Sequence, residues 1–303
     1  DAPTRGGPAV AAFADRYLAE HVRGRLKPAS ARRMRGDIAN HIVPALGRLP
    51  MGAVETAQVA ALHYRLRETP AAANGAVNTL SAMYRLAGIW GVLPEGVNPC
   101  RGVDRYRTGR PERFLSEREF ARLGRALGEC EAAGEVSGHA AAAIRLLMLT
   151  GCRHSEILSL RWEDVDLKRA ALRLRESKTG PKTVPLSAAA VRALSNLTRR
   201  DGTPWVVPGR GSGGHLSSLQ RSWRRVCERA ELEGVRLHDL RHSFASRALA
   251  LGEGLPMIGK LLGHTQMQST ARYAHLARAA VKASAERVAA SLAGDLAGAS
   301  PRT

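Results

Sequence analysis

Apolar residues recur at helical spacing through most of this chain, and that periodicity limits its fold more than any other feature. The first part contains one apolar stripe, made by Val10, Phe13, Tyr17 and Leu18. Three further periodic segments follow, PASARRMRGDIANHIV, AQVAALHYRLRE and AVNTLSAMYRLAGIW. Four helices of this length predict a small helical bundle.

Proline and glycine mark the expected ends of these helices. Pro28 stands near the start of the second helix, and Pro44 and Gly47 follow that helix. Gly91 and Pro94 follow the fourth helix. We therefore expect the bundle to end near residue 92.

A second domain is expected after a basic linker. Residues 93–113 contain Pro, Gly and five arginines but no apolar period, which is typical of a connection between domains. Ser116 with Glu119 has the pattern of a capping box, so a helix and the second domain should begin there. The segment ALRLRESKTGPKTVPLS alternates apolar and polar residues on both sides of a turn, which predicts a β-hairpin with Lys178 at its tip.

Helical periodicity returns after this hairpin, at about 187–198, 217–231, 239–251 and 256–262. The predicted fold class is mainly α with a small β-sheet. The predicted parts are a helical domain over residues 1–92, the basic linker over 93–113, a second domain over 114–285 and a C-terminal tail over 286–303.

The chain is strongly basic, with 46 Lys and Arg against 27 Asp and Glu and a formal net charge of +19. Such an excess favours a polyanionic partner, because guanidinium groups bind phosphate oxygens through two donors and positive charge steers association. The alternative is an Arg-rich composition without a binding role, in keeping with the bias towards Ala, Arg and Gly. We expect nucleic acid as the partner.

Four cysteines stand at positions 100, 130, 152 and 227, and they form neither a CxxC pair nor a Cys/His cluster with zinc spacing. We expect reduced thiols. The apolar run AAAIRLLMLT is interrupted by Arg145 and is too short to cross a bilayer, and the N-terminus lacks a signal-peptide pattern. A cytoplasmic protein without a membrane partner is therefore expected. Because the chain begins at Asp1 rather than Met, we allow for an additional N-terminal module.

A dispersed set of polar residues gives the second domain its chemical character. The set contains two guanidinium groups, an ammonium, two imidazoles and a phenol. Brought together, these groups can bind a phosphodiester, attack its phosphorus and protonate the leaving oxygen without a metal. The six residues, found in TGCRHSEI, ESKTG, LHDLRHSFAS, LLGHT and STARYAH, are Arg153, Lys178, His238, Arg241, His264 and Tyr273.

Several of these residues also have an ordinary structural explanation. Arg153 could form an ion pair with Glu156, which in the functional interpretation braces it, and Tyr273 could be a packed side chain. Lys178 is the natural proton donor to a leaving 5′ oxygen, because an ammonium on a hairpin tip can reach it. Lys182, across the same turn, competes for that role.

In these motifs the chain resembles the tyrosine recombinase (bacteriophage integrase) family, over roughly residues 112–285. The resemblance implies that the six residues hold that family's Arg, Lys, His, Arg, His and Tyr catalytic positions, and that residues 1–92 form a core-binding domain. It implies that DNA strands are cleaved and rejoined through a 3′-phosphotyrosyl intermediate, with no cofactor, ATP or metal. It also implies a homotetramer on two double-stranded DNA sites and leaves room for accessory DNA-bending proteins.

Two other functions remain open. A type IB topoisomerase uses similar chemistry on one duplex, although the LLGH segment and the small helical N-terminal domain favour a recombinase. A non-enzymatic DNA-binding protein on the same fold would need the charge but not the phenol of Tyr273. Among recombinases, we prefer the integrase of a mobile genetic element to a chromosome-dimer resolvase.

Overall fold

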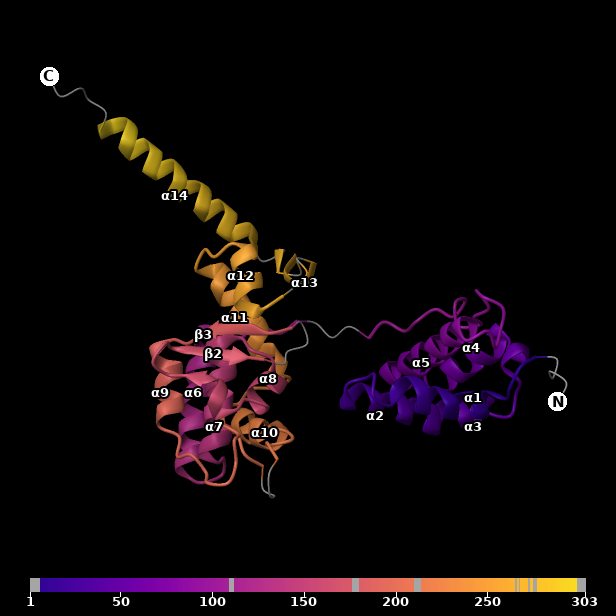
Figure 1. Cartoon of the computed structure of the whole chain (residues 1–303). Helices are drawn as coiled ribbons and strands as arrows, with labels where there is room; N and C mark the ends of the chain where they lie inside the picture. Colours follow the sequence, from indigo (N-terminus) through magenta and orange to yellow (C-terminus); the bar gives the residue numbers. More distant parts are fainter. Residues whose placement is uncertain are drawn as a thin grey trace. The chain divides into compact units, whose positions relative to one another are not determined.

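Helices make up most of both units into which the chain divides, Asp1–Arg110 and Pro111–Thr303 (Figure 1). The computed structural model describes residues 6–108, 112–175, 180–209, 214–264, 266, 268–271, 273–274 and 277–298. Among them, strands are confined to a small sheet in the second unit, so the predicted fold class is confirmed.

The first unit is a helical bundle around one apolar core. Its buried side chains include Phe13, Ile42, Leu62 and Leu80, one from each of the four periodic segments of the sequence. All four segments are helical, as predicted. The helices are α1 (Val10–Tyr17), η1 (Leu18–Val22), α2 (Pro28–Asp37), η2 (Ile38–Ile42), α3 (Val43–Leu46), η3 (Met51–Ala53), α4 (Thr56–Arg65) and α5 (Pro70–Ile89).

The prediction that the second helix ends before Pro44 is wrong. The chain passes from α2 through the π-helical turn η2 directly into α3, and Pro44 lies in the first turn of α3. The wider hydrogen-bond spacing of a π turn shifts the helical register, and a first-turn position suits a residue that has no N–H to donate. Gly47 then forms the C-cap of α3.

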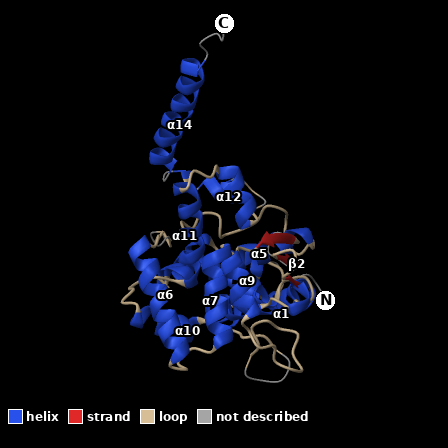
Figure 2. Ribbon diagram, turned by 90° about the vertical axis from the view of Figure 1, so that its left-hand side faces the viewer, coloured by secondary structure: helices blue, strands red, loops and turns tan. Residues whose placement is uncertain are grey.

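The second unit surrounds helix α7 (Gly138–Thr150), which contacts its neighbours on several sides (Figure 2). Its small side chains, Ala140 to Ala143, are buried and let other helices approach closely. The other helices of this unit are α6 (Glu117–Ala132), α8 (His154–Leu158), η4 (Trp162–Asp164), α9 (Ala188–Ser195), α10 (Gln220–Arg229), α11 (Leu237–Ala250), α12 (Leu255–Leu262), α13 (Gln268–Ala271) and α14 (Ala277–Gly298).

The start of this unit follows the sequence closely. Ser116 is the N-cap of α6, where its Oγ accepts a hydrogen bond from the Glu119 N–H at 3.3 Å. The Ser116 N–H donates in return to the Glu119 carboxylate at 2.8 Å. The predicted capping box is therefore confirmed.

The sheet is antiparallel, with the strand order β1 (Val165–Asp166), β2 (Ala171–Leu174) and β3 (Lys182–Pro185). Leu174 pairs with Lys182 at the end of the β2–β3 ladder, which confirms the predicted hairpin. Its expected tip residue, Lys178, lies outside the described residues. Over the described part of the chain, no helix combines the length and apolar character that a membrane span requires.

Candidate active site

The turn after α7 brings Arg153 to the site. Gly151 ends α7 in the left-handed conformation, at a φ of 63°, and a Cβ at this position would lie 2.6 Å from Cδ1 of Phe244 on α11. Glycine satisfies both the backbone angle and the close packing. Arg153 follows as the N-cap of α8, at the junction between the buried helix α7 and the next helix.

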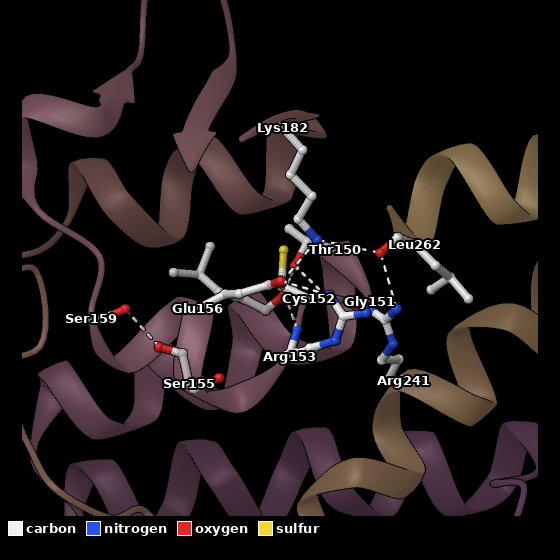
Figure 3. A network of polar contacts seen from close by, with 11 residues as sticks. Thr150, Gly151, Cys152, Arg153, Ser155, Glu156, Ser159, Lys182, Arg241 and Leu262 are labelled. Carbon is white, nitrogen blue, oxygen red and sulfur yellow. Dashed lines mark hydrogen bonds and ion pairs between the residues drawn. The ribbon is translucent and has the colours of Figure 1, made fainter. Parts of the chain in front are cut away.

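Glu156, on α8, is a buried carboxylate that holds two cations (Figure 3). Its Oε1 accepts from Arg153 Nη1, and its Oε2 accepts from the Arg153 N–H and from Lys182 Nζ, all at 2.9 Å. Burial alone would raise the pKa of the Glu156 carboxyl. The hydrogen bonds from Lys182 and Arg153 outweigh burial and leave the pKa below its ordinary value. The predicted contact between Glu156 and Arg153 is confirmed.

Lys182, the first residue of β3, points into this network. Besides the bond to Glu156, its Nζ donates to the backbone carbonyl of Leu262 at 3.3 Å. Gly263 makes room for it, because a Cβ at that glycine would lie 2.5 Å from Cδ of Lys182. The structure thus ties the hairpin to the end of α12 through the lysine that competes with Lys178.

Arg241, on α11, is buried and fixed by backbone acceptors. Its Nη1 donates to the Gly151 carbonyl at 2.7 Å and its Nη2 to the Leu262 carbonyl at 2.9 Å (Figure 3). These carbonyls belong to the turn after α7 and to the last turn of α12, where helical carbonyls lack intrahelical partners. Burial and the neighbouring Arg153 lower the pKa of Arg241, which stays charged because arginine titrates far above neutral pH.

His264 follows the end of α12. Gly263 ends that helix in the left-handed conformation, at a φ of 67°, which a residue without a Cβ adopts easily. The His264 N–H donates to the Gly259 carbonyl at 2.9 Å, and its Nδ1 lies 2.8 Å from Oγ1 of Thr270. The imidazole is therefore held by the short segment that leads to Tyr273.

Tyr273 lies in the protein interior, with an exposed fraction of 1%. Its Oη is 2.8 Å from Nδ1 of His242, which is itself 4% exposed. The phenol lies close enough to Arg241 to influence that guanidinium electrostatically. The expected nucleophile thus lies next to α11, which carries two of the other expected site residues.

His238 stands in the first turn of α11, one turn before His242. The residue is exposed, yet its ring packs edge-on against the His242 ring, with 4.7 Å between centroids. Desolvation of the ring by the surrounding protein is the main cause that lowers the pKa of His238, to about 4, and the nearby His242 and Arg241 lower it further.

The structure brings together most of the residues singled out from the sequence. Arg153 and Arg241 converge at the turn after α7, and His238, His264 and Tyr273 lie on the segments that pack beside it. Sequence reasoning missed the Lys182 contact with Glu156 and the His242 contact with Tyr273. The only signal for His242 was its place beside Arg241 in LHDLRHSFAS.

Comparison with models of known protein families identifies the family to which this chain belongs. Residues 113–280 match the model of the Phage integrase family. Because this match covers more than half of the chain, the chain belongs to the phage integrase family.

Individual relatives agree with that family. The shufflon-specific DNA recombinase of Escherichia coli is 32% identical over 202 residues, which are 65% of this chain and 49% of that protein. This chain therefore spans about half the length of that relative.

Solved structures share the fold at low sequence identity. The Tn1549 transposon integrase in complex with transposon right end DNA has a TM-score of 0.74 and 17% identity, over 93% of this chain and 100% of that chain. A lambda integrase tetramer bound to a Holliday junction has a TM-score of 0.66 and 19% identity, over 87% of this chain and 79% of that chain.

Proposed function

We propose that this chain is a site-specific DNA recombinase, an integrase that cleaves and rejoins DNA strands through a 3′-phosphotyrosyl intermediate. One observation carries the proposal most strongly: two guanidinium groups from different helices, Arg153 and Arg241, are held at one turn beside the tyrosine-bearing segment. Membership of the phage integrase family supports the same activity.

In the proposed reaction, Arg153 and Arg241 bind the non-bridging oxygens of the scissile phosphate. Oη of Tyr273 gives up its proton and attacks the phosphorus, the P–Oη bond forms, the P–O5′ bond breaks, and the leaving 5′ oxygen takes up one proton, so no net proton is gained or lost. Guanidinium groups that protein acceptors already hold in place need little reorganisation as charge develops on the phosphorane. His238 and His264 complete the site as hydrogen-bond partners of the phosphate. Rejoining is the reverse transfer, because the energy of the phosphodiester is kept in the phosphotyrosyl bond.

We assign to Lys178 the role of proton donor to the leaving 5′ oxygen. The ammonium of Lys182 is engaged by Glu156 and by the Leu262 carbonyl, which suits a residue that holds the site together. Lys178 stands between β2 and β3 in the sequence, and the proposal gives the proton transfer to its ammonium.

Double-stranded DNA is the proposed substrate, and a homotetramer acting on two DNA sites is the proposed assembly. The net charge of +19 supports a polyanionic substrate. The Tn1549 integrase bound to transposon end DNA supports a role in a mobile element, and the lambda integrase tetramer on a Holliday junction supports the assembly.

The test is covalent capture on nicked suicide DNA substrates from the protein's genomic neighbourhood, in the presence of EDTA. Tyr273→Phe should bind the same DNA with unchanged affinity but form no covalent complex, because the variant lacks only the nucleophilic oxygen. A denaturing gel resolves the covalent band, and a mobility-shift assay measures binding. A wild-type band that persists in Tyr273→Phe, or bound DNA without any wild-type band, would contradict the proposal.

A further inference from the structure

Tyr273 lies where it cannot reach a DNA phosphate. Its exposed fraction is 1%, and it packs in an apolar cluster with Leu249, Ile258 and Leu262. A nucleophile must come within about 3.5 Å of the atom that it attacks. Because a DNA backbone cannot enter this cluster, the segment that carries Tyr273 must move before strand cleavage.

Besides the bond from the His264 N–H to the Gly259 carbonyl at its start, three polar contacts of Thr270 and Tyr273 among the described residues hold that segment. The Tyr273 N–H donates to the Thr270 carbonyl at 3.0 Å, and His264 Nδ1 lies 2.8 Å from Thr270 Oγ1. Both of these contacts lie within residues 264–273 and can move with them. The third contact joins Oη of Tyr273 to Nδ1 of His242 on α11, at 2.8 Å. It is the one of the three that ties the phenol itself to another element.

His242 also contacts a residue of the proposed phosphate site. Its ring lies edge-on to that of His238, one helical turn earlier, with 4.7 Å between centroids. Since His242 is only 4% exposed, its ring is enclosed by packed protein atoms and has no solvent to move into when the His238 ring shifts towards it. A phosphate that reorients His238 would therefore press on the partner of Tyr273.

We propose that His242 is a positioning residue that holds Tyr273 in its buried position and links occupation of the phosphate site at His238 to release of the nucleophile. This inference rests on the proposed function, because it assumes that Tyr273 attacks a phosphate bound near His238. A single hydrogen bond of this kind shifts an equilibrium by about threefold to tenfold. His242 therefore restrains Tyr273 without locking it.

The first test measures the exposure of Tyr273 and needs no DNA. Hydroxyl-radical footprinting with peptide mass spectrometry compares Tyr273 with two internal standards, Tyr64 at 63% exposed and Tyr84 at 1% exposed. In the wild type, Tyr273 should be modified as slowly as Tyr84. His242→Phe keeps a ring but removes Nδ1, and it should speed modification of Tyr273 about threefold to tenfold.

Two further variants distinguish loss of the hydrogen bond between His242 and Tyr273 from a general loss of stability. In His242→Asn, the amide can replace Nδ1 as a hydrogen-bond partner, so modification of Tyr273 should fall back towards the wild-type rate. His139→Phe makes the same exchange on α7, where the imidazole contacts the Thr198 carbonyl, and should leave Tyr273 protected. If Tyr273 stays as protected as Tyr84 in His242→Phe, or is equally exposed in both His242 variants, the inference is wrong.

The second test measures cleavage. On a suicide substrate that the wild type cleaves, His242→Phe should form the covalent complex about threefold to tenfold faster in single turnovers, with unchanged DNA affinity. A slower reaction would overturn the restraint and assign His242 a supporting role in attack. If the wild type forms no covalent complex while footprinting gives the expected pattern, the proposed function fails and the contact between His242 and Tyr273 stands.

Discussion

At the scale of single residues, the candidate site is organised by acceptors that hold cations. The Glu156 carboxylate binds Arg153 and Lys182, and the Leu262 carbonyl accepts from Lys182 and Arg241. Each acceptor joins groups from different elements. The positive charges that a phosphate requires are therefore positioned by the protein itself, which reduces the reorganisation needed in a reaction.

Glu156→Gln should lower the free energy of unfolding of the second unit by about 3 kcal/mol at pH 7, because it leaves two largely buried cations, Arg153 and Lys182, without a carboxylate partner. The folded-state pKa of Glu156 is depressed, so its stabilising contribution is complete above the pKa of an unfolded glutamate, about 4.3. The contribution is lost as the pH falls through the lower, folded-state pKa. Denaturant unfolding from pH 7 to pH 3 should thus show the difference between wild type and variant shrinking below about pH 4.3.

The control for this prediction is Glu129→Gln, which removes an exposed carboxylate 3.8 Å from Arg229. It should change the free energy of unfolding by no more than about 0.5 kcal/mol. A Glu156→Gln protein that is as stable as this control at pH 7 would show that the buried carboxylate does not hold the two cations together.

The sequence indicates which residues of this site could take part in phosphoryl transfer, but it predicts only some of the contacts between them. The contact of Arg153 with Glu156 spans three residues and follows from helical spacing. Lys182 meets Glu156 across 26 residues and His242 meets Tyr273 across 31, so these pairs depend on how separate elements pack. The Leu262 acceptor is a backbone carbonyl, which no side-chain pattern can indicate.

At the scale of elements, helix ends build the site. The ends of α7 and α12 supply the carbonyls that accept from Arg241, and the start of α8 places Arg153. Caps of this kind have sequence signatures, so the capping box of Ser116 and the glycine end of α12 were predictable. Pro44 was not, because a π turn leaves no comparable mark in the sequence.

Gly151→Ala should destabilise the second unit by about 2 to 4 kcal/mol. A left-handed backbone costs a non-glycine residue about 1–2 kcal/mol, and the added Cβ, 2.6 Å from Phe244, costs about as much again in overpacking. Because the same turn carries the acceptor of Arg241, covalent capture should also weaken. Thermal and denaturant unfolding measure the first effect, and the suicide-substrate assay measures the second.

Gly124→Ala is the matched control for Gly151→Ala. Gly124 lies within α6, and a Cβ there would meet nothing within 4 Å. Alanine favours a helix interior by about 1 kcal/mol over glycine, so this variant should be more stable than the wild type. Equal effects of the two substitutions would refute the special requirement for glycine at position 151.

At the scale of the whole molecule, charge is the property that both units share. The net charge is +19, and basic residues exceed acidic ones in Asp1–Arg110 as well as in Pro111–Thr303. Within the second unit, Arg153 and Lys182 are largely buried around Glu156, while other cations pair at the surface with exposed carboxylates, as Arg224 does with Glu228. Exposed pairs of this kind contribute little to stability, so the excess charge is better explained by a polyanionic partner than by folding.

Binding to duplex DNA should therefore weaken steeply as salt rises. Each phosphate neutralised by a basic side chain contributes about −0.9 to the slope of log K against log salt concentration, so about six contacts give a slope near −5. Fluorescence anisotropy with a labelled duplex between 50 and 200 mM salt, a range of about fourfold, should show roughly a thousandfold loss of affinity. Tyr273→Phe should show the same slope, since it removes no charge at neutral pH. A flat response would mean that few phosphates are neutralised, and it would count against DNA as the substrate of the whole protein rather than against the chemistry of the site.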